Sequence, residues 1–175
     1  MTDELFILGL TLVFSLILSW GFRTLPAERW QILAAVPRRK HPDGDWQGEN
    51  LTFYGLFNAN AYVLGVMIFI VLMGAVATPP VVILAITAAL LGICIPASRI
   101  VARIVEKKRY TFTVGGASFV GILAAPWIVV AANLALGRWM TAPVSVMTFM
   151  AALSIAYAFG EGVGRLACIS FGCCY

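Results

Sequence analysis

Charged residues are scarce in this chain. Asp, Glu, Lys and Arg make up 11% of its 175 residues, whereas soluble globular domains carry about 25%. Hydrophobic residues make up 61% of the sequence, and the mean hydropathy is +0.93. This balance excludes an intrinsically disordered chain, which would be far more polar, and an ordinary soluble enzyme, which would be more highly charged. The composition therefore predicts a protein that crosses a membrane several times.

Histidine and cysteine are also few. The one histidine, His41, lies far in sequence from most of the four cysteines. Cys94 stands inside an apolar run, and Cys168, Cys173 and Cys174 crowd the C-terminal end. Adjacent cysteines rarely direct both thiolates at one ion, so we expect neither a metal site nor a disulfide framework. No basic stretch is interleaved with aromatic residues, and we expect no nucleic-acid partner.

Five apolar runs are long enough for transmembrane helices, which need roughly 20 residues. They extend from about Leu5 to Phe22, Phe57 to Val76, Val81 to Ile100, Val114 to Leu136, and Pro143 to Gly160. We expect the first run to be a retained helix, because Asp3 and Glu4 stand where a signal peptide would be basic. The predicted fold class is all-α, a polytopic integral membrane helix bundle with about five transmembrane helices in contact with the lipid bilayer.

The composition divides the chain into three ranges. Residues 1–22 form the first transmembrane helix, residues 23–50 form a polar interfacial loop, and residues 51–175 form a membrane domain. Within the loop, the pattern from Ala27 to Ala35 favours a short amphipathic helix in the membrane interface, with Trp30 as its anchor.

Positive charge is concentrated in two segments. Residues 23–50 and residues 99–109 contain five Lys or Arg residues each, whereas the two other connections contain none and one. Both basic segments lie on one side of the membrane if all five spans are real. The positive-inside rule then predicts that this side is cytoplasmic.

Two polar clusters interrupt the first part of the apolar background. Tyr54 opens the second span, and an aromatic belt at the membrane surface explains it as well as a functional role does. Asn58 lies inside that span, where an amide needs a hydrogen-bonding partner. Gly115 and Gly116 open the fourth span. They fit either close helix packing or exposed backbone N–H groups that would suit a phosphate.

The third cluster, residues 160–175, is the most informative. Glu161 and Arg165 are four residues apart, so on a helix they would form an ion pair on one face. Ionisable residues at membrane depth are costly and are a functional hypothesis by default, although a structural pair at a helix end is the alternative. Arg99 and Arg103 form a second pair with the same spacing. Guanidinium groups that face a cavity would suit a lipid phosphate, which they bind bidentately.

Taken together, these segments resemble the bacterial prolipoprotein diacylglyceryl transferase family over about residues 50–175. Residues 52–56 (Thr-Phe-Tyr-Gly-Leu) resemble the Trp-Tyr-Gly-Leu-Met segment that opens the family's first conserved helix. Residues 98–100 (Ser-Arg-Ile) match Gly-Arg-Leu/Ile-Gly, and residues 115–121 resemble Gly-Gly-Met-Ser-Phe-His-Gly-Gly. Residues 164–172 (Gly-Arg-Leu-Ala-Cys-Ile-Ser-Phe-Gly) resemble the signature Gly-Arg-Leu-Gly-Asn-Phe-Ile-Asn-Gly.

The resemblance implies an enzyme of lipoprotein biosynthesis in the bacterial inner (plasma) membrane. It would move the diacylglyceryl group of phosphatidylglycerol onto the lipobox cysteine of a prolipoprotein signal peptide, without a cofactor. Arg165 matches the signature arginine and Tyr54 the family tyrosine, and both become candidate catalytic residues. The candidate substrate-binding residues are Arg99, Gly115, Gly116, Ser118, Gly164, Cys168 and Gly172.

The departures from the family are specific. Val120 stands in place of the family histidine, and Cys168 and Phe171 replace the two asparagines of the signature. Cys173 replaces the acidic residue that follows it. The family continues through further helices, so we expect a divergent, C-terminally truncated member. The active site of the family opens toward the periplasm, which would place the two basic segments outside the cell. The positive-inside rule instead places them in the cytoplasm, so the orientation stays open.

Without the histidine, Glu161 is the remaining candidate for the base that deprotonates the substrate thiol. If Glu161 is instead held by Arg165, the chain has no evident base and is expected to be inactive. Two alternatives follow. One is a catalytically inactive member that binds phospholipid, and the other is a membrane thiol or redox protein that uses Cys168, Cys173 and Cys174.

Overall fold

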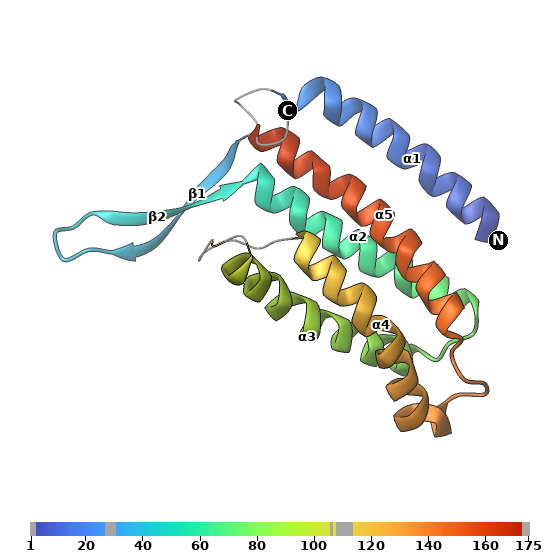
Figure 1. The fold of residues 1–175 in the computed structure, drawn as a ribbon. Coiled ribbons are helices and arrows are strands. Elements are labelled where there is room, and N and C mark those ends of the chain that lie inside the picture. The colour runs from blue at the N-terminus through green and yellow to red at the C-terminus, as the bar shows by residue number, and fades with distance from the viewer. Residues whose placement is uncertain (1–2, 27–30, 106, 108–113, 173–175) are drawn as a thin grey trace. The chain divides into compact units, whose positions relative to one another are not determined.

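The computed structural model describes residues 3–26, 31–105, 107 and 114–172 (Figure 1). Its five long helices are α1 (Asp3–Thr24), α2 (Phe53–Ala75), α3 (Pro80–Ile104), α4 (Val114–Leu136) and α5 (Val146–Phe171). Each is long and apolar enough to cross a membrane. The expected fold class is confirmed: this is an all-α, multi-pass membrane protein.

Two helix boundaries have clear local causes. Pro80 is the first residue of α3, where the fixed φ angle of proline suits a helix start and its missing N–H costs nothing. Helix α2 ends just before Ala77, whose φ angle of 58° lies in the left-handed region, and the Ala77 N–H donates to the carbonyl of Gly74 at 3.0 Å. A short 3-10 turn, η2 (Gly137–Trp139), follows α4.

The segment that joins α1 to α2 contains a β-hairpin rather than the expected helix. Strand β1 (Ile32–Lys40) pairs antiparallel with β2 (Trp46–Thr52). The amphipathic helix predicted from Ala27 to Ala35 is therefore wrong over residues 32–35, and residues 27–30 lie outside the described residues. Pro37 disfavours a helix, and Gly44, with a φ angle of 95°, allows the tight turn that brings the two strands together.

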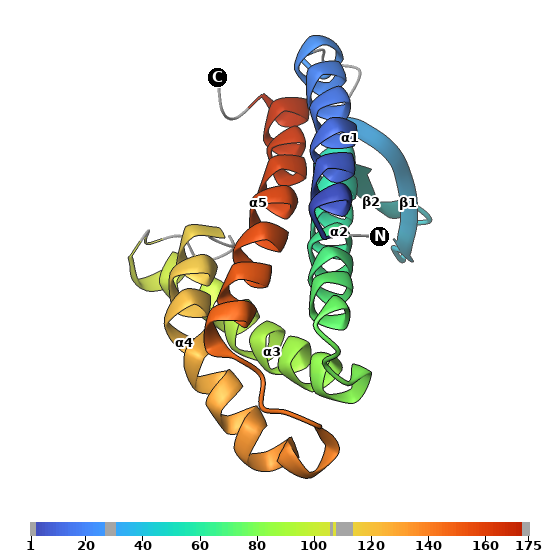
Figure 2. The ribbon, with the colours of Figure 1, turned by 90° about the vertical axis from the view of Figure 1, so that its right-hand side faces the viewer.

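The chain divides into two compact units, residues 1–68 with 155–175, and residues 69–154. In the first unit, α5 packs against both α1 and α2 (Figures 1 and 2). Leu25, Leu166 and Ile169 form a buried cluster there. Against α2, a Cβ atom on Gly160 would lie 3.3 Å from the carbonyl oxygen of Ala61. Glycine therefore lets these two helix backbones approach closely.

In the second unit, α3 and α4 pack against each other as an antiparallel pair. Their close approach occurs where the Cys94 sulfur would lie 3.0 Å from a Cβ atom on Gly121. The Asn133 side chain joins α4 to the segment before α5. Its amide donates to the Val144 carbonyl at 3.0 Å, and its carbonyl oxygen accepts from the Val144 N–H at 2.9 Å. This unit is held by small-residue packing and by one polar clamp.

Candidate functional site

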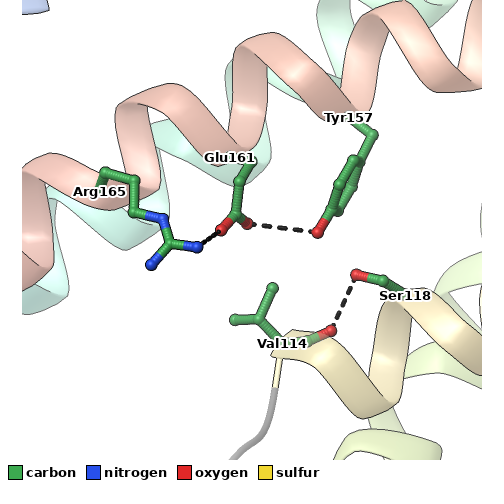
Figure 3. Close-up of polar contacts among 5 residues, drawn as sticks. All are labelled: Val114, Ser118, Tyr157, Glu161 and Arg165. Atoms are coloured by element: carbon green, nitrogen blue, oxygen red, sulfur yellow. Dashed lines mark hydrogen bonds and ion pairs between the residues drawn. The ribbon is translucent and has the colours of Figure 1, made fainter.

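Three polar side chains are placed by α5 along one face, one turn apart. Arg165 forms an ion pair with Glu161 through Nη2, at 2.8 Å (Figure 3). The Tyr157 hydroxyl donates to the other oxygen of the same carboxylate at 3.5 Å. The four-residue spacing explains the alignment, because such residues are neighbours on a helix surface. The ion pair expected from the sequence is confirmed, whereas Tyr157 was not anticipated.

The pair does not lie in the core of its unit. The Arg165 side chain is 59% exposed and that of Glu161 is 29% exposed. A guanidinium carries five N–H donors, and the contact with Glu161 is made through one nitrogen. The geometry therefore presents a cation that is held in position and still has donors for a second anion, such as a phosphate.

The start of α2 meets the end of α5. The Tyr54 and Phe171 rings pack edge to face, with their centroids 5.8 Å apart. Tyr54 as a whole residue stays 41% exposed. Asn58 finds the partner that its amide needs by donating to the Tyr54 carbonyl at 3.0 Å. Phe171 thus holds the Tyr54 ring close to the end of the helix that carries Arg165.

The other predicted residues of this unit lie along α5 and just after its end. Gly172 takes a φ angle of 75° just after α5, a conformation that glycine adopts without strain, and its N–H donates to the Ile169 carbonyl at 3.2 Å. A Cβ atom on Gly164 would meet that of Ala61 at 3.8 Å, so Gly164 lies at the packing face with α2. Cys168 is half-buried on α5. Cys173 and Cys174 lie outside the described residues.

The second unit holds the other predicted residues. Gly115, Gly116 and Ser118 lie in the first turns of α4, and Arg99 lies near the end of α3. The Ser118 hydroxyl donates to the Val114 carbonyl of its own helix at 2.8 Å (Figure 3). Cys94 meets Gly121 and the two helices are antiparallel. Arg99, five residues after Cys94, and Gly116, five residues before Gly121, therefore lie at about the same level.

The predicted site residues thus fall into two groups, one in each unit. Tyr54, Glu161 and Arg165 form the group of the first unit. Arg99 and the opening turns of α4 form that of the second. Within the part of the chain that the structure describes, no three His, Cys, Asp or Glu side chains gather as a metal site.

The fold defines the class of the protein: a multi-pass membrane protein, with an ion pair between Glu161 and Arg165 on its last helix. Comparison with protein-family models, with curated proteins and with solved structures finds no match to this chain.

Proposed function

We propose that this protein is a bacterial plasma-membrane transferase that moves the diacylglyceryl group of phosphatidylglycerol onto the lipobox cysteine of prolipoproteins. The observation that carries the proposal is the placement of Arg165. Its guanidinium is positioned by Glu161 and is more than half exposed, on the helix whose sequence resembles the transferase signature. Tyr54 lies at the end of that helix, against Phe171.

The proposed step is a displacement at carbon. The substrate cysteine, as a thiolate, attacks the glyceryl carbon of the lipid and forms a C–S bond. The C–O bond to phosphate breaks, and its electron pair leaves with glycerol-1-phosphate. The thiol proton passes to a base. The reaction needs positive charge and fixed donors at the leaving phosphate, and Arg165 supplies both.

Glu161 is the proposed base. Because it is paired with Arg165, binding of the lipid phosphate to Arg165 would also free the base. A lipid phosphate that binds Arg165 competes with the Glu161 carboxylate for the same guanidinium. Once displaced, the carboxylate is available to accept the thiol proton. In this scheme the Tyr54 hydroxyl donates a hydrogen bond to the lipid head group, while Phe171 holds its ring.

Membrane topology supports the inclusion of the second group. In a chain that crosses the bilayer five times, successive helices run in opposite directions. The starts of α2 and α4 and the ends of α3 and α5 then belong to the same side of the membrane. Arg99, Gly115, Gly116 and Ser118 would therefore serve the same membrane surface as Arg165 and are proposed as substrate-binding residues.

A second function, binding of phosphatidylglycerol without transfer, is favoured by one observation. The Glu161 carboxylate is bonded to Arg165 at 2.8 Å, and the position that resembles the family histidine holds Val120. If the lipid does not displace Glu161, the chain can bind a phosphate and has no base to activate a thiol.

Mass spectrometry of a lipobox peptide tests both functions. The full chain, in phosphatidylglycerol-containing detergent, should add one diacylglyceryl unit to the peptide, and Arg165→Ala should abolish the addition. Arg138→Ala is the matched control, because Arg138 lies on η2 and belongs to neither group. An unmodified peptide with phosphatidylglycerol bound to the protein would select the second function. An unmodified peptide with no bound lipid would overturn both.

A further inference from the structure

The β-hairpin between α1 and α2 contains none of the candidate site residues (Figure 1). All nine residues of β1 are exposed, and so is every residue of β2 except the half-buried Thr52. A two-stranded hairpin is marginally stable by itself in water, and a third strand or a packed face is what usually stabilises one. Each strand also has an outer edge, on which backbone N–H and C=O groups need partners. The two edges are therefore the places at which another chain can add to this hairpin.

The hydrogen bonds of the hairpin determine which backbone groups of β2 face outward. The Phe53 N–H, just after β2, donates to the Gln31 carbonyl, just before β1, at 3.2 Å. Successive residues of a strand direct their backbone groups to opposite sides, and β2 pairs with β1 without skipping a residue. The N–H and C=O groups of Gly48, Asn50 and Thr52 therefore point away from β1. Among the described residues, no hydrogen bond from another backbone segment reaches them.

The outer edges of the two strands differ in how well they can accept a further strand. β1 has two register shifts, ends in the three basic residues 38–40, and contains Pro37, which has no N–H to donate. Natural sheets use bulges, prolines and basic residues to keep another strand from pairing with an edge. β2 is regular, has no proline, and has Glu49 as its one charged residue. The β2 edge is therefore open to a third strand, whereas the β1 edge is protected.

The open edge leads directly to the first group of site residues. Thr52 is the last residue of β2 and Phe53 is the first of α2, so Tyr54 stands two residues beyond the edge. Tyr54 packs against Phe171 of α5, the helix that carries Arg165. A strand that pairs with β2 would therefore have one end beside Tyr54. Lipid hydrocarbon cannot bond the outward N–H and C=O groups of this edge, whereas the backbone of an extended peptide can.

We propose that the β2 edge binds the acceptor protein, whose chain adds a third strand to the hairpin through the outward groups of Gly48, Asn50 and Thr52. The bound segment is the one on the aqueous side of the lipobox cysteine, because β2 runs toward the membrane and ends at α2. The seven residues of β2 span about 23 Å, so about seven residues of the acceptor would pair. The choice of this peptide rests on the proposed transferase function, whereas the open edge of β2 does not.

Peptide binding tests the edge separately from transfer. A fluorescent lipobox peptide with serine in place of its acceptor cysteine would be titrated with the full chain in nanodiscs. Asn50→Pro removes an outward N–H from β2 and should weaken binding about tenfold, because backbone hydrogen bonds to the peptide are lost. Ala35→Pro is the matched control, since Ala35 lies opposite Asn50 and its N–H faces the outer edge of β1. Its affinity should stay within about twofold of the unmodified chain, as expected for an edge that the peptide does not use.

Disulfide crosslinking tests whether the bound peptide is a strand. The Asn50→Cys chain would be oxidised with serine-substituted peptides that carry one cysteine at successive positions, and adducts on residue 50 would be measured after digestion. We expect adducts at every second peptide position, because alternate side chains of a strand share one face of the sheet. Ala35→Cys should give no adducts, because Ala35 lies one strand further from the β2 edge.

Three results would overturn the proposal. They are an unchanged affinity in Asn50→Pro, adducts on Asn50→Cys that lack the two-residue period, and disulfides between two Asn50→Cys chains that the peptide does not displace. The last result would assign the edge to a second copy of the chain. A cysteine-containing lipobox peptide separates this proposal from the transferase. If it pairs with β2 and stays unmodified, the transferase alone is contradicted. If it is modified without pairing with β2, this inference alone is contradicted.

Discussion

Among single residues, Glu161 is the one whose neighbours matter most for the proposed function. Its carboxylate accepts from Tyr157 on one oxygen and pairs with Arg165 on the other. The four-residue spacing was enough to predict the ion pair, because helix geometry brings such residues together. The spacing did not reveal Tyr157, since its contact depends on a side-chain rotamer in an otherwise ordinary aromatic position. Nor could the sequence decide whether Glu161 is a base or a partner, because that depends on what Arg165 binds.

Changing Glu161 to Gln separates these two roles. With no carboxylate competing for Arg165, binding of phosphatidylglycerol should become several-fold tighter, while transfer to the peptide should be lost with the base. Lipid titration and peptide mass measure the two effects. Glu49→Gln is the matched control, because it breaks the exposed Arg38–Glu49 pair of the hairpin, whose N–O distance is 2.7 Å. Weaker lipid binding in Glu161→Gln would contradict the competition.

At the scale of elements, the sequence pattern predicted the helices but not the hairpin. Long apolar runs bounded by prolines and polar residues predicted α1 to α4 closely. The fifth span was predicted to Gly160 with a tail toward Arg165, and α5 continues to Phe171. The Ala-rich stretch from Ile32 to Val36 has no clear period, and its strand depends on pairing with β2. Small residues were equally ambiguous, since glycine serves both phosphate binding and close packing. The structure assigns Gly160 and Gly164 to packing against α2.

The crossing of α2 and α5 depends on Gly160. Gly160→Leu should lower the free energy of unfolding by about 3 kcal/mol, because the new side chain would press on the backbone at Ala61 and force the helices apart. Thermal unfolding in detergent measures the loss. Gly92→Leu is the control, since a Cβ atom there has no neighbour within 4 Å. Equal stability of the two variants would refute this account of the crossing.

Asn133 should hold the segment that leads into α5. Asn133→Leu leaves the backbone N–H and carbonyl of the buried Val144 without their partners and should cost about 1–3 kcal/mol. Hydrogen exchange at the Val144 amide should accelerate accordingly. Thr87→Val is the control, because the Thr87 hydroxyl donates to its own helix at the Ile83 carbonyl and its loss should change little. Unchanged protection of Val144 in Asn133→Leu would contradict the clamp.

At the scale of the whole molecule, the sequence predicted five spans, and contacts reveal two units. Composition suggested three consecutive ranges of the chain. The units instead join residues 155–175 to residues 1–68, because α5 returns to pack on α1 and α2. Such long-range packing is not encoded in local hydropathy, so a sequence can give the number of spans without giving their partners.

Five crossings of the membrane predict the side on which each connecting segment lies. The hairpin turn and η2 lie on opposite faces of the membrane if α2, α3 and α4 all cross it, because three crossings separate them. Asp43→Cys and Arg138→Cys, each in a background without native cysteines, should react with an impermeant maleimide from opposite sides of sealed vesicles. Labelling of both positions from one side would contradict the five-span topology. The side that labels Asp43→Cys also decides between the charge rule and the orientation that the family resemblance implies.

The proposed diacylglyceryl transfer has two products that can be measured together. Purified full-length protein would be given phosphatidylglycerol with a labelled glycerol-phosphate head group and a synthetic lipobox peptide. We expect diacylglyceryl-modified peptide and free labelled glycerol-1-phosphate to appear in equal amounts, and both to vanish in Arg165→Ala. An unmodified peptide and intact lipid, under conditions in which an authentic transferase is active, would contradict the account.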